Sequence, residues 1–285
     1  MPSNEFQTFL EQYPTFKQTE SIDSLRKKDY ARLDSAEHIY LDYTGGGIYA
    51  ESQIKKHQKL LSENVFGNPH STNPTSIAAT HLVEGAREYI LKFFNADPDE
   101  YLAIFTLNAS GALKLVGESY PFANGRYLLT FDNHNSVNGI REFAHARGGD
   151  VTYIPVMLPD MRVDASQLNV ELSKPSQTGH NLFAYPAQSN FSSVKHPLEW
   201  IELAHSHGWD VLLDAAAFVP TSKLDLSKVK PDFVPISFYK IFGYPTGLGA
   251  LIARKSALAN LHRPWFADGT ITVASVQGDK YYLAD

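Results

Sequence analysis

The chain has 285 residues, 43% of them hydrophobic, and its 25 Lys and Arg against 31 Asp and Glu give a formal net charge of −6. This composition supports a sizeable buried core and excludes a disordered chain, and the acidic balance without a long basic run argues against nucleic acid or an anionic membrane as the main partner. The sequence contains no cysteine, which excludes disulfides, thiolate metal sites, a nucleophilic Cys and a persulfide carried on this chain.

Residues 1–35 predict a helical N-terminal arm, because apolar side chains recur there at helical spacing. Pro14 and residues 21–23 are expected to break the arm. The first residues have neither the pattern of a signal peptide nor that of a transit peptide, and no apolar stretch approaches about 18 residues. We therefore expect a cytosolic protein without a membrane segment.

From residue 36 onward, apolar bursts alternate with amphipathic runs, which predicts one domain over residues 36–285. Helices are predicted at about 51–64, 75–94, 110–120, 136–147 and 197–207. Short strands are predicted at 38–43, 101–106, 126–131, 150–156, 181–186, 210–216, 232–238 and 247–253. This alternation is typical of βαβ units, so the predicted fold class is α/β, a mostly parallel sheet with helices on both faces.

Polar residues follow several of these bursts directly. In an open α/β sheet, ligands bind beyond the carboxyl ends of the strands, so these residues are the candidates for a site. They are found at 108–111, at 132–136, at 188–190, at 214 and at 240.

The segment 108–111 and His134 each allow two interpretations. Small residues and a hydroxyl that open a helix offer backbone N–H groups to an anion such as phosphate, but Ser110 as an ordinary helix N-cap explains the same segment. His134 is either a structural histidine or a ring that stacks on an aromatic cofactor. A metal site at His205, His207 and Asp210 is not favoured, because these residues fall at the end of a predicted helix.

Asp214 and Lys240 allow two interpretations as well. Asp214 ends a strongly apolar strand and needs a partner, which is either a group of the fold or a protonated pyridine nitrogen. Lys240 either extends its amine to solvent or holds it in a desolvated pocket, as a Schiff base requires. A phosphate cradle, a stacking His, an Asp for a ring nitrogen and a Lys for an aldehyde are together what pyridoxal 5'-phosphate (PLP) requires.

Three strings carry a family resemblance: YPAQSNFS at 185–192, LLDAAAFVPTSKLDLS at 212–227 and DFVPISFYKIFGYPTGLGALIARK at 232–255. They resemble the aminotransferase class V domain of eukaryotic molybdenum cofactor sulfurases. These proteins are related to the cysteine desulfurases, among the fold-type I PLP enzymes. The likeness extends from residue 41 to about residue 275, so it covers most of the chain.

The resemblance implies roles for individual residues. Lys240 matches the lysine that forms the internal aldimine, Asp214 the partner of the pyridinium nitrogen, and His134 the histidine that stacks on the ring and moves protons. Ala109 and Ser110 match phosphate-loop residues, and Ser237 matches a phosphate-binding hydroxyl. Asn190 matches the residue near the phenolic oxygen of the cofactor, with Gln188 as its neighbour in the motif. Thr270 matches a threonine from which one subunit reaches the phosphate of its neighbour.

The sequence also departs from the family. Asn108, Ala267 and Asp268 stand where glycines are expected, and a carboxylate beside a phosphate weakens its binding. The family continues into a small C-terminal domain with the sulfur-accepting cysteine and an arginine for the substrate carboxylate. The chain ends at Asp285, so we expect the large domain without the small one.

Three functions therefore stay open. The first is a PLP enzyme that acts on a small amino acid such as L-cysteine through Lys240, without its own persulfide cysteine. The second is a catalytically impaired PLP-domain protein that pairs with a full-length homologue, and the third is a fragment of a sulfurase. Because fold-type I sites usually form at a dimer interface, a homodimer or a pair with a homologous PLP subunit is expected.

Overall fold

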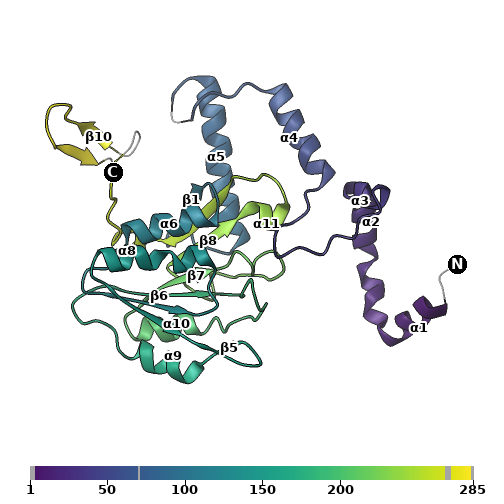
Figure 1. Ribbon diagram of the computed structural model, residues 1–285. Coiled ribbons are helices and arrows are strands. Elements are labelled where there is room, and N and C mark those ends of the chain that lie inside the picture. Colours follow the sequence, from purple (N-terminus) through teal and green to yellow (C-terminus); the bar gives the residue numbers. More distant parts are fainter. Residues whose placement is uncertain (1–3, 70, 267–270, 284–285) are drawn as a thin grey trace. The chain divides into compact units, whose positions relative to one another are not determined.

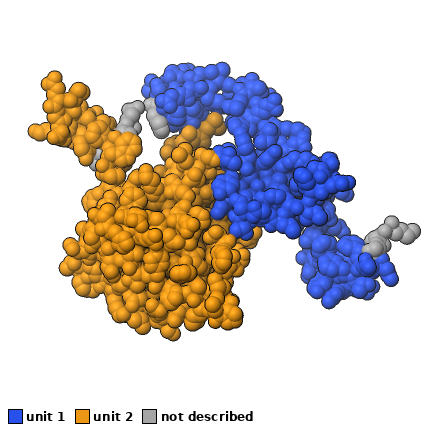
Figure 2. Space-filling model, in the orientation of Figure 1, with its two compact units in different colours: residues 1–80, 239–246 blue, residues 81–238, 247–285 orange. Residues whose placement is uncertain are grey.

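The computed structural model describes residues 4–69, 71–266 and 271–283 (Figure 1). The chain forms two compact units, coloured separately in Figure 2. Unit 1 comprises residues 1–80 and 239–246, and unit 2 comprises residues 81–238 and 247–285. Among the described helices, not one combines the length and the apolar character needed to cross a bilayer.

The N-terminal part of unit 1 is helical, as predicted. It contains α1 (Asn4–Gln12), the 3-10 helix η1 (Pro14–Thr19), α2 (Glu20–Asp29) and α3 (Ala31–Ser35), followed by α4 (Glu51–Glu63) and the start of α5 (Pro74–Phe93). The expected break at residues 21–23 is wrong, because these residues lie inside α2. Glu20 and Asp23 stand in the first turn of α2, where carboxylates interact favourably with the helix dipole.

The strand predicted at residues 38–43 is wrong. This segment has no regular secondary structure, and Ile39 and Leu41 are 87% and 82% exposed. The Tyr40 hydroxyl lies 2.9 Å from the carbonyl of Asp42 and 2.8 Å from that of Gly46, which fits a local turn. An apolar run forms a strand only where another strand pairs with it, and no described strand pairs with this segment.

The segment 239–246 is held inside unit 1 by hydrogen bonds to its backbone carbonyls. The N–H of Gly47 donates to the carbonyl of Tyr239 at 3.0 Å, and the side-chain amide of Gln53 donates to the carbonyl of Tyr244 at 3.2 Å. Gly243 has a φ of +71°, and a Cβ at this position would collide with the backbone N of Tyr49. Only glycine meets both conditions without strain.

Unit 2 is built on a seven-stranded sheet with the order β1-β9-β8-β7-β6-β2-β3. Strand β9 is antiparallel to both of its neighbours, and the other pairings are parallel. The predicted mostly parallel sheet is therefore confirmed. The strands are β1 (Tyr101–Thr106), β2 (Arg126–Thr130), β3 (Asp150–Ile154), β6 (Asn181–Pro186), β7 (Asp210–Asp214), β8 (Phe233–Ser237) and β9 (Gly249–Arg254).

Helices cover both faces of this sheet: α6 and α8 lie on one face, and α9 and α10 on the other (Figure 1). The helix predicted at 136–147 is divided at Gly139. The unpredicted elements are α9, α11, α12 and the two small hairpins β4–β5 and β10–β11. The remaining bounds are α6 (Ala109–Ser119), α7 (Asn135–Asn138), α8 (Ile140–Ala146), α9 (Ala165–Leu172), α10 (Trp200–Ser206), α11 (Phe238–Phe242), α12 (Lys255–Leu258), β4 (Val156–Met157), β5 (Arg162–Val163), β10 (Ile271–Ala274) and β11 (Tyr281–Leu283).

The core of unit 2 lies between the sheet and the α6–α8 layer. The fully buried apolar side chains there include Leu113, Val116 and Ile140 of the two helices and Tyr127 and Leu129 of β2. Burying one such side chain contributes about 1.5–3 kcal/mol relative to leaving it exposed. This core fixes the strands, and with them the residues that follow each strand.

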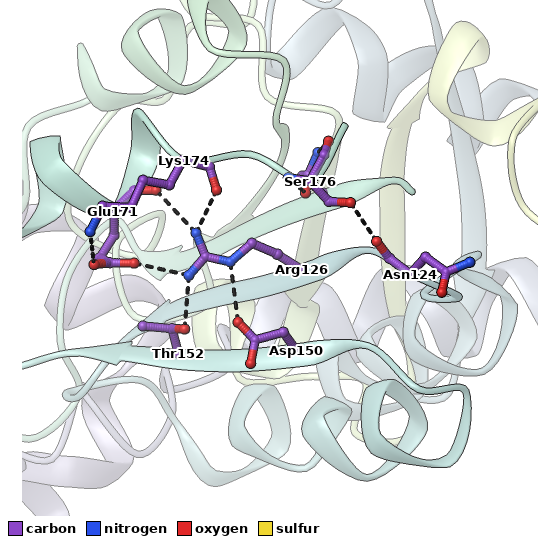
Figure 3. Close-up of polar contacts among 8 residues, drawn as sticks. Asn124, Arg126, Asp150, Thr152, Glu171, Lys174 and Ser176 are labelled. Carbon is purple, nitrogen blue, oxygen red and sulfur yellow. Dashed lines mark hydrogen bonds and ion pairs between the residues drawn. The ribbon is translucent and has the colours of Figure 1, made fainter. Parts of the chain in front are cut away.

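The amino-terminal edge of the sheet is closed by an ion-pair network around Arg126, the first residue of β2 (Figure 3). Its guanidinium donates to carboxylate oxygens of Glu171 at 2.9 Å and Asp150 at 3.2 Å. It also donates to Thr152 Oγ1 at 3.0 Å and to the carbonyls of Lys174 at 2.6 Å and Glu171 at 3.5 Å. All five N–H groups of the guanidinium therefore have acceptors, as expected for a structural arginine.

Candidate functional site

The carboxyl ends of β1, β2, β6, β7 and β8 meet at one edge of the unit 2 sheet, because these strands run parallel. The structure brings most of the predicted site residues to this edge: Ala109, Ser110, His134, Gln188, Asn190, Asp214 and Ser237. Lys240 belongs to unit 1, in α11. Thr270, together with Ala267 and Asp268, lies outside the described residues.

The helix α6 begins with a cap that differs from the one considered in the sequence. The side chain of Asn108, not that of Ser110, is the N-cap, and its oxygen accepts from the N–H of Gly111 at 2.8 Å. Ser110 is exposed, and its hydroxyl lies 2.7 Å from the hydroxyl of Ser136. The unexpected residue at 108 thus stabilises the helix start and leaves the Ser110 hydroxyl outside the cap.

Ser237 meets the start of α6 directly. Its hydroxyl oxygen accepts from the N–H of Ala109 at 2.9 Å, and the residue is only 3% exposed. Gly249 makes this approach possible: a Cβ there would lie 2.5 Å from the Ile236 carbonyl oxygen and 2.7 Å from Asn108 Cα. The positive end of the α6 dipole and hydroxyl groups from two elements are therefore concentrated at one place, which suits an anion.

His134 has a fixed ring orientation although it is exposed. It is the N-cap of α7, where its Nδ1 accepts from the N–H of Ser136 at 3.1 Å. An accepting Nδ1 carries no hydrogen, so in the neutral ring the hydrogen resides on Nε2. The preceding Asn133 donates from its amide to the carbonyls of Thr130 and Ala184, which connects this turn to β2 and β6.

His134 and Asn190 line the same cavity of about 590 Å³ in unit 2. The loops after β2 and β6 that carry them are joined by a buried pair, in which His196 Nε2 lies 2.8 Å from Asp132 Oδ2 and both side chains are 2% exposed. His196 also stacks on Trp200 at a centroid distance of 5.3 Å. His196 could not be predicted from the sequence, because its role depends on a partner 64 residues away.

Asp214 and Gln188 are neighbours at the ends of β7 and β6. Asp214 pairs in register with Pro186, and its buried carboxylate accepts from the N–H of Ala216 at 3.0 Å. Gln188 Oε1 is buried and has no hydrogen-bond partner among the described residues. A buried acceptor of this kind leaves a position for a donor that the fold itself does not supply.

Lys240 is half-buried in the segment that Gly47 and Gln53 hold in unit 1. Within the part of the chain that the structure describes, its amine makes no hydrogen bond or ion pair. For the same described part, no group of three or more His, Asp or Glu is arranged to hold a metal ion. His205, considered above as a metal ligand, instead contacts Asp232 Oδ2 at 2.8 Å.

Comparison with known sequences gives consistent matches. The profile of the aminotransferase class-V family matches residues 39–285. Molybdenum cofactor sulfurase of Solanum lycopersicum is 38% identical over 97% of this chain and 38% of its own length. The Bos taurus molybdenum cofactor sulfurase is 42% identical over 92% of this chain and 31% of its own length. The chain thus spans about a third of the length of these curated relatives.

Solved structures agree with the fold. An apo cysteine desulfurase of Thermococcus onnurineus NA1 matches with a TM-score of 0.77 and 25% identity, over 92% of this chain and 64% of that one. The C-DES mutant K223A with glycine covalently linked to its PLP cofactor matches with a TM-score of 0.70 and 21% identity, over 90% of this chain and 66% of that one. At this identity, the second match supports the fold alone.

Proposed function

Because the chain belongs to the aminotransferase class-V family, we propose that it binds PLP at the carboxyl edge of its sheet and acts on a small amino acid such as L-cysteine. The observation that carries the proposal is the contact at 2.9 Å between the Ser237 hydroxyl and the Ala109 N–H at the start of α6. It joins two phosphate-binding positions implied by the family resemblance in one buried cradle.

The phosphate would be held by this cradle. The start of α6 offers the positive end of the helix dipole, which favours a phosphate, while the N–H groups of Ala109 and Gly111 already donate to Ser237 and Asn108. The Ser110 and Ser237 hydroxyls come from different elements and are hydrogen-bonded to Ser136 and Ala109, so their positions are fixed before any ligand arrives. Thr270 stays a prediction as a further phosphate contact from a neighbouring subunit.

The ring would be held by side chains of the neighbouring strand ends. Asp214 would interact with the protonated ring nitrogen, since a buried carboxylate stabilises a cation strongly. His134 would stack on the ring face, held by its bond to Ser136. Asn190 would lie near the phenolic oxygen, with Gln188 beside it. The amine of Lys240 would anchor the aldehyde carbon.

When bound, PLP supplies an electron sink for the carbanion that forms next to the substrate amine. The chain's own residues would then transfer protons. The Lys240 amine would accept or donate the proton of the substrate carbon that carries the amine, and Nε2 of His134 would be a second group for proton transfer. The chain has no cysteine, so sulfur taken from L-cysteine would pass to an external thiol, which becomes a persulfide while cysteine becomes alanine. Cleavage of the C–S bond is thereby balanced by formation of the S–S bond.

The cofactor proposal has a direct test. Purified protein mixed with PLP should develop a visible absorption band, and borohydride reduction should leave the cofactor mass on the peptide that contains Lys240. Lys240→Ala should lack both the band and the labelled peptide, whereas the exposed Lys223→Ala should retain them. A wild-type protein that stays colourless at saturating PLP contradicts the proposal.

The absence of cysteine favours a second candidate, a PLP-binding protein with impaired turnover that pairs with a full-length homologue. Alanine release from L-cysteine, measured with dithiothreitol as the external thiol, separates the two candidates. Alanine that forms with the PLP-loaded wild type and not with Lys240→Ala supports the enzyme. PLP binding without alanine release supports the impaired protein.

A further inference from the structure

The loop that carries Asn190 is a small hairpin between β6 and α10. Its two sides meet where the N–H of Ser189 donates to the carbonyl of Val194 at 2.9 Å and the N–H of His196 donates to the carbonyl of Ala187 at 3.1 Å. Asn190 lies at the tip, where it is exposed and its side chain makes no hydrogen bond to the described residues. Its position therefore depends on how the base of the hairpin is held.

One residue of the neighbouring loop, Asp132, holds the base of this hairpin at two points. Its carboxylate oxygen Oδ2 lies 2.8 Å from His196 Nε2, and both side chains are 2% exposed. Its backbone carbonyl accepts from the Ser189 hydroxyl at 3.4 Å. The same hydroxyl oxygen accepts from the N–H of Phe191 at 3.3 Å, so the tip of the hairpin is connected to Asp132 as well.

The contact between the two side chains also satisfies a buried charge. While Asp132 is ionised, Nε2 of His196 carries the hydrogen of this bond and donates it to Oδ2. Among the described residues, His196 is the one donor to this carboxylate, and Oδ1 has no partner there. Loss of the imidazole would leave a buried carboxylate without a donor, which is costly, so the loop would have to move and admit water.

Aromatic stacking holds the imidazole from its other side. The rings of His196 and Trp200 lie 5.3 Å apart between centroids with an interplanar angle of 21°. Trp200 in turn lies 5.5 Å from the ring of Tyr185, a buried residue of β6. The sheet thus fixes the imidazole, and the imidazole fixes the carboxylate of Asp132.

We propose that Asp132 and His196 are positioning residues for the two loops that would contact the cofactor ring. Asp132 lies two residues before His134, and His196 closes the hairpin that carries Asn190. Asp132, His134 and Asn190 line one cavity of about 590 Å³, so the two loops face each other. Because His134 and Asn190 are proposed cofactor contacts, this inference rests on the proposed PLP site.

Hydrogen–deuterium exchange of the full chain without PLP tests whether the pair holds the hairpin. His196→Phe keeps an aromatic ring beside Trp200 and removes the donor, so the amides of residues 187–195 should exchange about tenfold faster or more. His196→Gln keeps an amide donor near the place of Nε2 and should restore most of the protection. Trp209→Phe is the matched control, because it removes the buried hydrogen bond of 2.8 Å to the Leu172 carbonyl at the opposite edge of the sheet.

The visible band of the PLP-loaded chain tests the positioning role. His196→Phe should weaken PLP binding about tenfold, as expected for the loss of a hydrogen bond to a charged group. It should also raise the pH at which the band changes, since a displaced Asn190 amide no longer offsets the charge of the phenolic oxygen. His196→Gln should restore most of both properties. Trp209→Phe should unfold at a lower urea concentration and leave both properties unchanged.

Each experiment has an outcome that contradicts the proposal. Unchanged exchange of residues 187–195 in His196→Phe shows that the pair does not hold the hairpin. Faster exchange with unchanged PLP affinity and band refutes the positioning role, as does an equal loss of affinity in Trp209→Phe. Asp132→Asn keeps the shape and removes the charge, so it should give smaller changes of the same sign, and it replaces His196→Phe if that variant does not fold. A colourless wild type refutes the proposed function and the positioning role with it, whereas the exchange result is independent of the cofactor.

Discussion

Arg126 shows how a charged side chain of unit 2 serves the fold. Arg126 is 15% exposed and holds Glu171, which is 17% exposed. The hydrogen bond from Arg126, followed by that from Lys174, lowers the pKa of the Glu171 carboxyl. A mostly buried carboxylate that accepts from two cations stabilises the native state, and its removal leaves uncompensated positive charge.

We predict that Glu171→Gln lowers the free energy of unfolding by about 1–2 kcal/mol at neutral pH. Because the folded-state pKa lies below the unfolded-state pKa, the contribution is present above the unfolded value of about 4.3 and is lost as the pH falls through the lowered folded-state value. Urea unfolding at neutral and acidic pH measures the difference between variant and wild type, which should shrink in acid. An equal penalty at both pH values contradicts the prediction, and the exposed Glu142→Gln is the control.

At the scale of elements, the cradle depends on three segments that meet at one point: the end of β8, the start of α6 and the first residue of β9. Gly249 lies at the point where these three segments come close together, next to the backbone of Ile236 and Asn108. The strands fix this approach, since Gly249 pairs in register with Thr106 on one side and with Ser237 on the other.

Gly249→Ala should therefore damage the cradle. The added methyl group would lie within 2.5 Å of the Ile236 carbonyl oxygen, so strand or helix must shift, at a cost of about 1–3 kcal/mol in unfolding free energy. We expect PLP affinity, measured by the visible band, to fall about tenfold or more. Gly85→Ala is a matched control, because this helical glycine has no atom within 4 Å of an added Cβ. Unchanged PLP affinity in Gly249→Ala argues against the cradle.

The elements show what the sequence could predict. Buried parallel strands such as β6 are continuous apolar runs, and long amphipathic helices such as α4 and α5 have a clear period, so both were found. The run at 38–43 has the same composition as a strand but lacks a partner. The strand-end residues Ala109 and His134 could be predicted from their position and Ser237 only from the family resemblance, whereas the role of His196 depends on its contact with the distant Asp132.

At the scale of the whole molecule, the sheet of unit 2 has its stabilising ion pairs at one edge and its proposed ligand-binding groups at the other. One edge is closed by ion pairs around Arg126, and the other presents hydroxyl, amide and carboxylate groups. A ligand at the second edge binds the folded chain and not the unfolded one, so it shifts the folding equilibrium.

We predict that PLP at about 100 times its dissociation constant raises the unfolding free energy by about 2.7 kcal/mol. Urea unfolding with and without PLP measures this gain, and inorganic phosphate, which occupies the cradle alone, should give a smaller one. Lys240→Ala should lose most of the PLP gain and retain that from phosphate. A PLP gain that is the same in Lys240→Ala contradicts the anchoring role of this lysine.

The contact at 2.7 Å between the Ser110 and Ser136 hydroxyls has a further consequence. Each hydroxyl has one hydrogen, so a Ser110 that donates to an arriving phosphate must receive the hydrogen of Ser136. The two bonds then point the same way and polarise each other. Since the N–H of Ser136 also donates to the His134 ring, a phosphate bound in the proposed cradle would reorient the Ser136 hydroxyl dipole next to the imidazole.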